Sequence, residues 1–359
     1  MSAYLQYVPI LIAKQGERRA LRDLPPAARA GMIPMFVLPP RTVDSDSGQP
    51  KKTVDQHVRN IAKDIGACWR GPAFVDTLHL EGDQLGPGGH PLEILADSLA
   101  ESDVEVIPST SLGRSSRYQM AVAELERRNG QGVCFRLPPE EWPSVDDGDA
   151  LRTLMGRLQI GPRRVDLILD CGNRIGKLPS LASSGFESEL MSLPLAGLWR
   201  SVTVAGASAP VGMSELPRGL NSIERVEWSA YRELLVDLDA RTPTFGDYGI
   251  VNPDGDKRQF SNVVNMSAAL RYTRDDQWIF AKGDLARGKG SIGNKAMIAV
   301  AKRLSASPHF AGARHCPADA WIAEAAAGTS VGGATQWIQH GTLHHLVTVS
   351  EQLANLLSP

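Results

Sequence analysis

The sequence predicts an α/β fold, a (β/α)8 barrel of the TIM type with a β-hairpin inserted near the eighth unit and extra helices at the C-terminal end. Two observations predict this fold. Short apolar runs alternate with helical patterns along the first 250 residues, and the strand-then-helix unit recurs about every 35 residues, eight times over. In addition, no G-x-G-x-x-G follows the first run, which removes the main support for an open, doubly wound sheet.

Eight runs are rich in β-branched residues and mostly do not alternate, which is typical of parallel strands covered on both faces. These runs cover residues 7–13, 32–39, 73–80, 104–111, 132–138, 165–171, 201–207 and 244–251. Helical patterns with apolar residues at three- and four-residue spacings lie between them. Thr53 and Ser115 stand where helix starts are favoured, and Gly66 and Gly130 stand where helices stop.

The eighth unit is longer than the others. After the last run, a turn-rich segment leads to "MSAALRYT" and "QWIFAKG", two strand-like runs around the charged turn "RDDQ". We expect a hairpin insertion at about 252–283, a last barrel helix over 293–307, and a C-terminal helical extension at about 308–359 that ends in the helical pattern "HHLVTVSEQLANLL". No linker rich in Pro, Gly or Ser interrupts the chain, so residues 1–359 are expected to form one domain.

Composition narrows the class of protein. Hydrophobic residues make up 42% and charged residues 22% of the chain, which argues against a disordered or fibrous protein. The net charge of −2 gives no global attraction to nucleic acid or anionic lipid, so any polyanion site must be a local basic patch. Four cysteines without a C-x-x-C pair argue against a zinc knuckle. The first apolar run ends at Lys14, too early for a signal peptide or membrane span, so we expect a cytoplasmic protein with no membrane partner.

Charged residues near the predicted strand ends are candidates for a site, because functional side chains in such barrels gather there. Arg136 and Asp170 stand in otherwise apolar runs, where an unpaired charge would cost several kcal/mol, so both should have partners. Pairing for structure and pairing within a ligand site are both open, and Asp76 carries the same two alternatives. The segment 281–296 combines four cations with glycines before a helix, which indicates either an anion cradle or a solvated basic loop.

The C-terminal segment "HGTLHHL" carries three histidines. If Thr342 caps a helix, His344 and His345 lie in its first turn, where the helix dipole disfavours protonation and leaves neutral imidazole. Adjacent helical residues point about 100° apart, so we expect one of the two to line the barrel mouth and the other to pack. This spacing weakens a chelating pair, and neither a metal nor a cofactor is expected.

Several segments together resemble a known family: "YVPILIAKQGERRAL", "IPMFVLPP", "GDY", "ALRYT" followed by a tryptophan, and the terminal "W…HGTLHHL". The ordered set is similar to the beta protein family, named for a phage T4-like beta protein, from Tyr7 to Leu353. The resemblance implies a phage–host setting, with a role in antiphage defence beside a small nuclease-like protein, and no settled activity. The positions that match are Lys14, Glu17, Asp247, Tyr248, Arg271, Trp278, Trp337, Gly341, His344 and His345. The chain has Gln339-His340 where many relatives are more basic, which argues against a required cation there.

Two functional hypotheses follow. In the first, the barrel rim binds a phosphate-bearing ligand, a nucleotide or a nucleic-acid end. Its candidate ligand-binding residues are Lys14, Glu17, Arg41, Arg136, Asp170, Tyr248, Arg271, Trp278, Lys282, Lys289, Trp337 and His345. If the protein is also a hydrolase of phosphoester bonds, which the sequence does not decide, His344 and Asp247 would supply the acid–base chemistry.

In the second hypothesis the barrel is a non-catalytic module that recognises a protein partner, either a phage component or a companion nuclease. A third possibility is metal-assisted hydrolysis through carboxylates and one imidazole at strand ends, namely Asp76, His79, Asp170 and Asp247. No H-x-H or H-E-x-x-H pattern supports the third possibility, so it ranks last.

Overall fold

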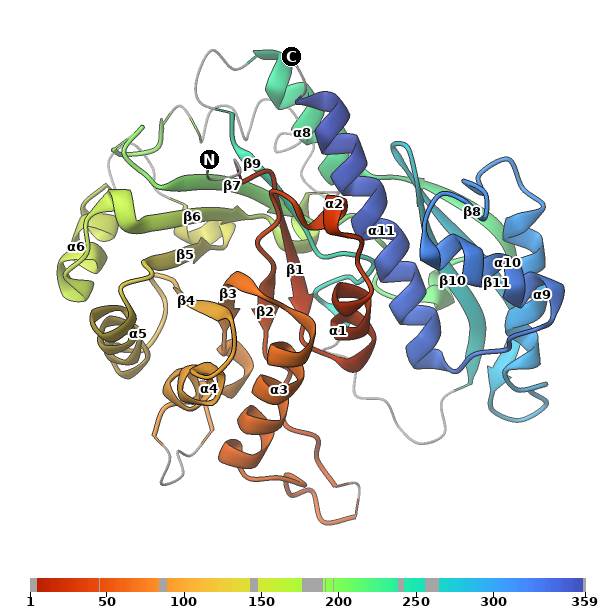
Figure 1. Ribbon diagram of the computed structural model, residues 1–359, viewed down its shortest axis with the longest axis horizontal. Coiled ribbons are helices and arrows are strands. Elements are labelled where there is room, and N and C mark those ends of the chain that lie inside the picture. The colour runs from red at the N-terminus through yellow and green to blue at the C-terminus, as the bar shows by residue number, and fades with distance from the viewer. Residues whose placement is uncertain are drawn as a thin grey trace.

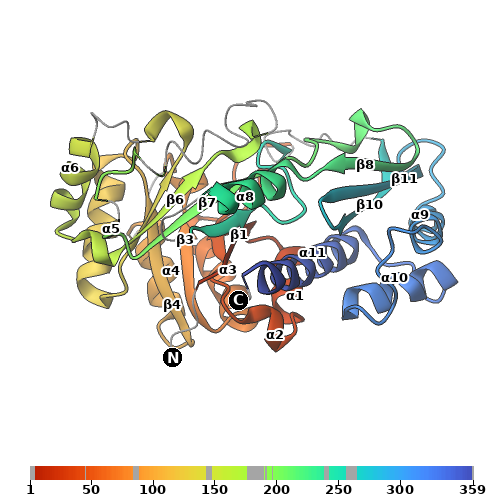
Figure 2. The same ribbon diagram turned by 90° about the horizontal axis from the view of Figure 1, so that it is seen from above.

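Eight parallel strands close into a barrel in the order β1-β2-β3-β4-β5-β6-β7-β9 (Figure 1, Figure 2). The computed structural model describes residues 5–44, 46–83, 89–142, 148–175, 190, 192–195, 197–237, 242–255 and 265–357. The barrel strands are β1 Tyr7–Ile12, β2 Met35–Val37, β3 Gly71–Asp76, β4 Val104–Thr110, β5 Val133–Leu137, β6 Val165–Asp170, β7 Ser201–Gly206 and β9 Thr244–Asp247. Each strand overlaps one of the eight apolar runs, and the predicted (β/α)8 barrel is confirmed.

Alternate residues of each strand fill the barrel interior. The interior cluster includes Val8, Ile10, Phe74, Cys134 and Ile168, all buried, while the intervening residues face the surrounding helices. Because side chains alternate along a strand, the inward positions continue upward to polar residues at the carboxyl ends of the strands. The mouth of the barrel is therefore polar, above apolar interior layers.

Helices surround the barrel on its outer side (Figure 2). They are α1 Gln15–Arg22, α2 Pro26–Arg29, α3 Val54–Cys68, α4 Pro91–Leu99, α5 Ser116–Asn129, α6 Gly148–Leu158 and α8 Val226–Asp237. Thr53 and Ser115 cap α3 and α5 as predicted, and Gly130 ends α5 in the left-handed conformation with φ of 66°. The stop predicted at Gly66 is wrong, because α3 continues to Cys68; a Cβ on Gly66 would lie 3.3 Å from the Cβ of Ser102.

A second, antiparallel sheet stands beside the barrel in the order β10-β11-β8 (Figure 1). It comprises the expected hairpin, β10 Met266–Arg274 and β11 Gln277–Arg287, and one further strand, β8 Gly219–Glu224. One face packs on α9 Lys295–Ser305 and α10 Pro317–Ala327. The sequence analysis contains no strand at β8, because "GLNSIE" alternates between exposed and half-buried residues and becomes a strand only by pairing with the edge of β11.

The last helix, α11 Ala334–Leu356, crosses the molecule between the barrel and the added sheet (Figure 1). The condition that Thr342 caps this helix is not met, since Thr342 lies inside the helix and Gly333 precedes its first residue. Gly341 also lies inside the helix. A Cβ there would lie 2.9 Å from Cδ1 of Ile250 and 3.2 Å from the carbonyl oxygen of Arg271, so the missing side chain lets α11 approach β10 closely.

Within the described residues, no helix is both long and apolar enough to span a membrane.

Candidate functional site

Four side chains from four strand ends meet at the barrel mouth around Arg136. Its Nε donates to Oδ2 of Asp170 at 2.8 Å, its Nη1 to Oδ2 of Asp76 at 2.9 Å, and its Nη2 to the Tyr248 hydroxyl at 2.7 Å. The Tyr248 hydroxyl in turn donates to Oδ2 of Asp170 at 2.6 Å. The structure therefore brings together three of the predicted ligand-binding residues, Arg136, Asp170 and Tyr248. It also places Asp76 beside them, a residue for which the sequence left a structural role and a site role open.

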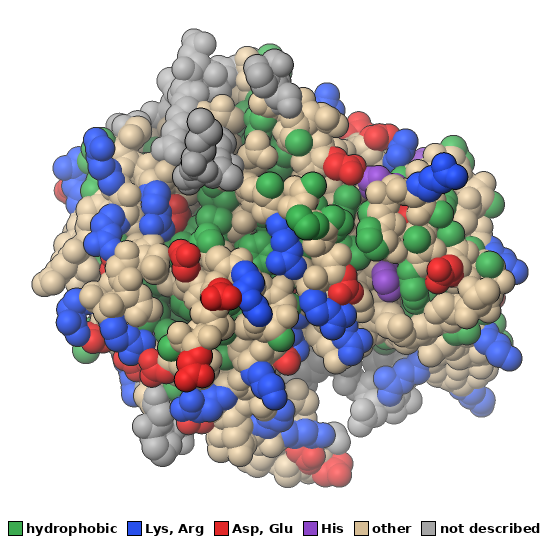
Figure 3. Space-filling model, in the orientation of Figure 1, with side chains coloured by type: hydrophobic (Ala, Val, Ile, Leu, Met, Phe, Trp, Pro, Cys, Tyr) green, Lys and Arg blue, Asp and Glu red, His purple; other side chains and the backbone are tan. Residues whose placement is uncertain are grey.

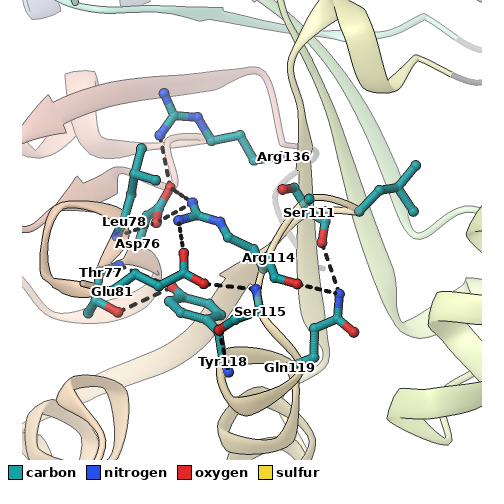
Figure 4. A network of polar contacts seen from close by, with 12 residues as sticks. Asp76, Thr77, Leu78, Glu81, Ser111, Arg114, Ser115, Tyr118, Gln119 and Arg136 are labelled. Atoms are coloured by element: carbon teal, nitrogen blue, oxygen red, sulfur yellow. Dashed lines mark hydrogen bonds and ion pairs between the residues drawn. The ribbon is translucent and has the colours of Figure 1, made fainter. Parts of the chain in front are cut away.

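Arg114, in the loop between β4 and α5, extends this network (Figure 4). Its Nη2 donates to Oδ1 of Asp76 at 2.9 Å and its Nη1 to Oε2 of Glu81 at 3.2 Å, while its guanidinium lies over the Tyr118 ring, 4.9 Å from the ring centre. The Asp76 carboxylate thus bridges the guanidinium groups of Arg114 and Arg136. Arg114 is not among the residues predicted from the sequence, because it stands among polar loop residues; its place between a strand end and a helix start is the only signal that points to it.

The charges of this mouth network are largely matched. Burial alone would raise the pKa of Asp76, but Arg114 and Arg136 outweigh burial and hold that pKa below its ordinary value. Burial raises the pKa of Tyr248, so its hydroxyl keeps its proton. Two guanidinium groups face three carboxylates, those of Asp76, Glu81 and Asp170. Because the network is not net positive, it does not attract an anion by itself.

Asp247 belongs to a second network, on the outer side of β9. Its Oδ2 accepts a hydrogen bond from Nε2 of His345 at 2.8 Å, and its Oδ1 accepts one from the Tyr7 hydroxyl at 2.7 Å. Nδ1 of His345 lies 2.7 Å from Oγ1 of Thr273, and the imidazole stacks on Trp278 with ring centres 5.0 Å apart. We call these residues the seam, because they join barrel, α11 and added sheet.

The seam is withdrawn from solvent. Asp247 and Trp278 are each 1% exposed and His345 is 0% exposed. Burial lowers the pKa of His345 despite the nearby Asp247 carboxylate, which favours a neutral ring that donates from Nε2 and accepts at Nδ1. The sequence analysis expected neutral imidazole for a different reason, the first-turn dipole; the cause in the structure is desolvation in mid-helix.

His344 does not contact Asp247. Its Nδ1 lies 2.9 Å from Oδ2 of Asp319 and its Nε2 lies 2.8 Å from the carbonyl oxygen of Thr273, and its ring stacks on Tyr272. Both His344 and His345 are fully buried. The structure therefore pairs Asp247 with His345, and the expectation that one of the two histidines lines the barrel mouth is wrong.

Most of the predicted cationic residues have partners. Arg41 forms a two-pronged ion pair with Asp83, with nitrogen–oxygen distances of 2.8 and 2.7 Å. Nζ of Lys282 donates to the carbonyl oxygen of Leu216 at 2.6 Å. Glu17 is buried in the first turn of α1, where it accepts a hydrogen bond from the backbone N–H of Lys14. Each of these three side chains therefore has a structural partner within the fold, which explains its position without a ligand.

Arg271 differs from the other cations. It lies on β10 opposite Phe280, two residues from Thr273 of the seam, and is partly buried. Among the residues that the structure describes, no hydrogen bond or ion pair reaches its guanidinium, and burial alone lowers its pKa. An arginine withdrawn from water without a carboxylate partner is uncommon, because the charge loses hydration without compensation.

The predicted aromatic and glycine-rich features are rearranged. Trp337 is buried against Trp321, and its Nε1 donates to the carbonyl oxygen of Val331, so it offers no open stacking face. The segment 281–296 is half strand, because β11 runs through Arg287. Exposed Lys289 lies in the remaining loop, which leads to α9 at Lys295.

A cavity of about 230 Å³ lies away from the mouth, between α1 and α3. It is lined by Gln15, Arg18, Arg19, Arg22, Asp64, Ala67 and Cys68. Lys and Arg side chains on this side of the molecule are interspersed with Asp and Glu rather than gathered in one patch (Figure 3). The surface in that view offers no broad polyanion site, which agrees with the near-zero net charge.

Fold and site together define a (β/α)8-barrel protein with a network of ion pairs and hydrogen bonds at its mouth and, among the described residues, an arginine without a partner on its added sheet. The family model of the beta protein family matches residues 7–351, and the chain belongs to this family. No curated protein matches the chain.

Proposed function

We propose that the protein binds a phosphate-bearing ligand, a nucleotide or a nucleic-acid end, where the added sheet faces the barrel, with Arg271 as its main anion contact. The observation that carries this proposal is the partly buried guanidinium of Arg271, which no hydrogen bond or ion pair reaches within the described part of the chain. A phosphate can accept two parallel hydrogen bonds from one guanidinium, and such a pair gains strength where water is excluded.

The position of Arg271 favours a ligand near the barrel mouth. Residues directly opposite each other in an antiparallel pair share a face, so Arg271 lies on the same face as Phe280. Phe280 packs in one cluster with Ile250, which follows Tyr248 of the mouth network by two residues. Lys14 is exposed two residues beyond β1, the strand that pairs with β9, and is the second cation of the proposed site.

The mouth network suits the uncharged part of such a ligand. Tyr248, Arg136 and Asp170 present donors and acceptors in fixed positions, each held by at least two hydrogen bonds. Groups of this kind recognise hydroxyls and base edges rather than isolated charge. In this proposal Arg271 binds the phosphate, and the mouth network forms hydrogen bonds with the hydroxyls or base edges of the ligand.

Hydrolysis is a separate prediction. His344 and Asp247 are fully buried and bonded to different partners, so an acid–base role for them would require the seam to open. The setting in phage–host conflict, with a phage component or companion nuclease as partner, rests on family membership and is part of the proposal only on that ground.

Filter binding of a labelled single-stranded oligonucleotide and of a nucleoside triphosphate over a salt series tests the proposal. The variant is Arg271→Gln, and the matched control is Arg274→Gln, since Arg274 lies on the same strand and pairs with Asp275. We expect affinity that falls steeply with salt in the wild type and in the control. Arg271→Gln should lose about tenfold or more in affinity, the effect of roughly 1.4 kcal/mol.

Absence of salt-dependent binding to either probe would contradict the proposal and favour the protein-recognition hypothesis. Equal affinities for Arg271→Gln and the wild type would also contradict it.

A further inference from the structure

Four potential metal ligands converge beside the seam, where the start of α10 meets the middle of α11. His315, Cys316, Asp319 and His344 each offer one ligand atom, and these atoms all lie within 4.8 Å of one another. Cys316, Asp319 and His344 are buried, and the His315 side chain is 18% exposed. We propose that these four residues form a site for a divalent transition-metal ion, with Zn²⁺ as the ion that fits best.

The donor set matches the chemistry of zinc. Thiolate sulfur, imidazole nitrogen and carboxylate oxygen are its usual ligands, and a closed tetrahedral site uses four of them. Bonds of 2.0 to 2.3 Å place tetrahedral ligand atoms roughly 3.3 to 3.8 Å apart. The mutual limit of 4.8 Å therefore requires only small side-chain adjustments around an ion.

Hydrogen bonding orients His344 as a metal ligand. Its Nε2 lies 2.8 Å from the carbonyl oxygen of Thr273, which can only accept, so Nε2 carries a proton. Metal-bound histidines typically donate their second N–H to a backbone carbonyl or a carboxylate, which fixes the ring and its tautomer. Nδ1 is then the nitrogen directed at the cluster.

The contacts around Asp319 show where positive charge is required. Its Oδ2 lies 2.9 Å from Nδ1 of His344 and accepts a hydrogen bond from Sγ of Cys316 at 3.0 Å, while its Oδ1 accepts from the Tyr272 hydroxyl at 2.7 Å. A neutral His344 with Nε2 protonated would aim a lone pair at a carboxylate oxygen. A proton on one of these two atoms, or a metal ion, must therefore lie between them.

A metal ion would replace the protons that the Cys316 thiol and the Asp319–His344 pair carry in the metal-free protein. Zn²⁺ bound to the Cys316 thiolate, the Asp319 carboxylate and two neutral imidazoles forms a site with no net charge, which suits a buried location. Binding would displace the proton of the Cys316 thiol and the proton that lies between Asp319 and His344. Burial raises the pKa of the Cys316 thiol in the metal-free state, which works against thiolate formation and makes the metal compete with a stable protonated form.

A metal ion at this site would link helices and strands that are distant in sequence. Cys316 directly precedes α10 and Asp319 lies in its first turn, while His344 belongs to α11. Thr273 connects the cluster to β10, the strand that carries Arg271. Because His345 beside His344 contacts Asp247 of the barrel, an ion here would fix the C-terminal helices and the added sheet against the barrel. Such an ion would act on folding and rigidity, whether or not the protein binds a phosphate-bearing ligand.

Cobalt substitution in the full-length protein tests the site. The purified protein is stripped with a chelator and titrated with Co²⁺, whose visible bands report tetrahedral geometry and whose near-ultraviolet band reports a thiolate ligand. The variants are Cys316→Ser and the surface-accessible His315→Gln. Their controls are Cys68→Ser and His309→Gln, because Cys68 is 6% exposed against 7% for Cys316 and lies outside the cluster, as does His309.

We expect one equivalent of Co²⁺ with both bands in the wild type and in the two controls. Cys316→Ser should lose the thiolate band, and His315→Gln should bind at least about tenfold more weakly, as loss of one ligand predicts. Zn²⁺ should raise the melting temperature of the stripped wild type by more than that of stripped His315→Gln. Lack of uptake by the folded wild type, or an unchanged thiolate band in folded Cys316→Ser, would overturn the inference.

Discussion

Nε2 of His345 on α11 donates a hydrogen bond of 2.8 Å to Oδ2 of Asp247 at the end of β9. The two residues are 98 positions apart in the chain and both are withdrawn from solvent. Burial would raise the pKa of Asp247, but His345 outweighs it and holds that pKa below its ordinary value. This contact joins the C-terminal helix to the barrel, so the position of the added sheet depends on it.

Replacing His345 with Leu should destabilise the protein by at least about 3 kcal/mol, because it leaves the Asp247 carboxylate buried without its main partner. Urea unfolding of the variant, compared with Asp247→Asn and with the double variant, measures the effect. The double variant should lose less than the sum of the single variants, since both remove one contact. Strict additivity would show that the two side chains are not coupled.

Stability should decrease as pH falls below neutral, and His340 should contribute to that loss. Burial lowers the pKa of His340 to about 4 from its ordinary value of 6.5, and its ring stacks on Trp321. The unfolded chain therefore takes up a proton between pH 6.5 and 4 that the folded protein resists, which favours unfolding over that range. Urea unfolding of His340→Leu at several pH values should show a weaker pH dependence than the wild type; parallel curves would contradict this assignment.

Arg136→Met should destabilise the barrel by about 3 to 5 kcal/mol, because it leaves Asp76 and Asp170 without their shared guanidinium. Adding Asp170→Asn should restore part of the loss by removing one uncompensated charge. Denaturant unfolding of the single and double variants gives the coupling energy. A stable Arg136→Met variant would mean that the network contributes little to folding and would strengthen a purely functional role.

Gly341→Ala should cost about 1 to 3 kcal/mol, since the new Cβ would lie 2.9 Å from Ile250 and push α11 away from β10. Gly156 in α6 is the matched control, because a Cβ there meets nothing within 4 Å. Gly156→Ala should therefore stabilise the protein by about 0.5 to 1 kcal/mol through its better helix propensity. Thermal melts should show a lower melting temperature for Gly341→Ala and a higher one for Gly156→Ala. A shift in the same direction for both variants would contradict the close packing at Gly341.

The barrel could be predicted from the sequence because its strands are buried on both faces and stand out as continuous apolar runs, as in Val165–Asp170. β8 could not, since its residues are polar on one side and its partner β11 lies more than 50 residues later. The start of α11 was misplaced because Thr342 resembles a helix cap, while the actual first turn follows Gly333 without a side-chain cap. Contacts with segments distant in sequence therefore determine both the strand β8 and the start of α11.

The site was predictable where a charge interrupts an apolar run. Arg136 and Asp170 were found in this way, and the structure pairs them. Sequence reasoning selected His344 for Asp247, although His345 is the partner, because the phase of a helix cannot be read until its start is known. The cluster of His315 and Cys316 with His344 was not seen either, because a 25-residue separation between Asp319 and His344 leaves no local motif.

The location of a bound oxyanion tests the central claim most directly. Crystals grown without phosphate would be soaked in tungstate, which has the shape and charge of a phosphate group and a strong anomalous signal. We predict the strongest anomalous peak within hydrogen-bond distance of the Arg271 guanidinium and its loss in Arg271→Gln. A vacant Arg271, with tungstate bound instead in the cavity lined by Arg18, Arg19 and Arg22 or in the loop at Lys289, would contradict the account.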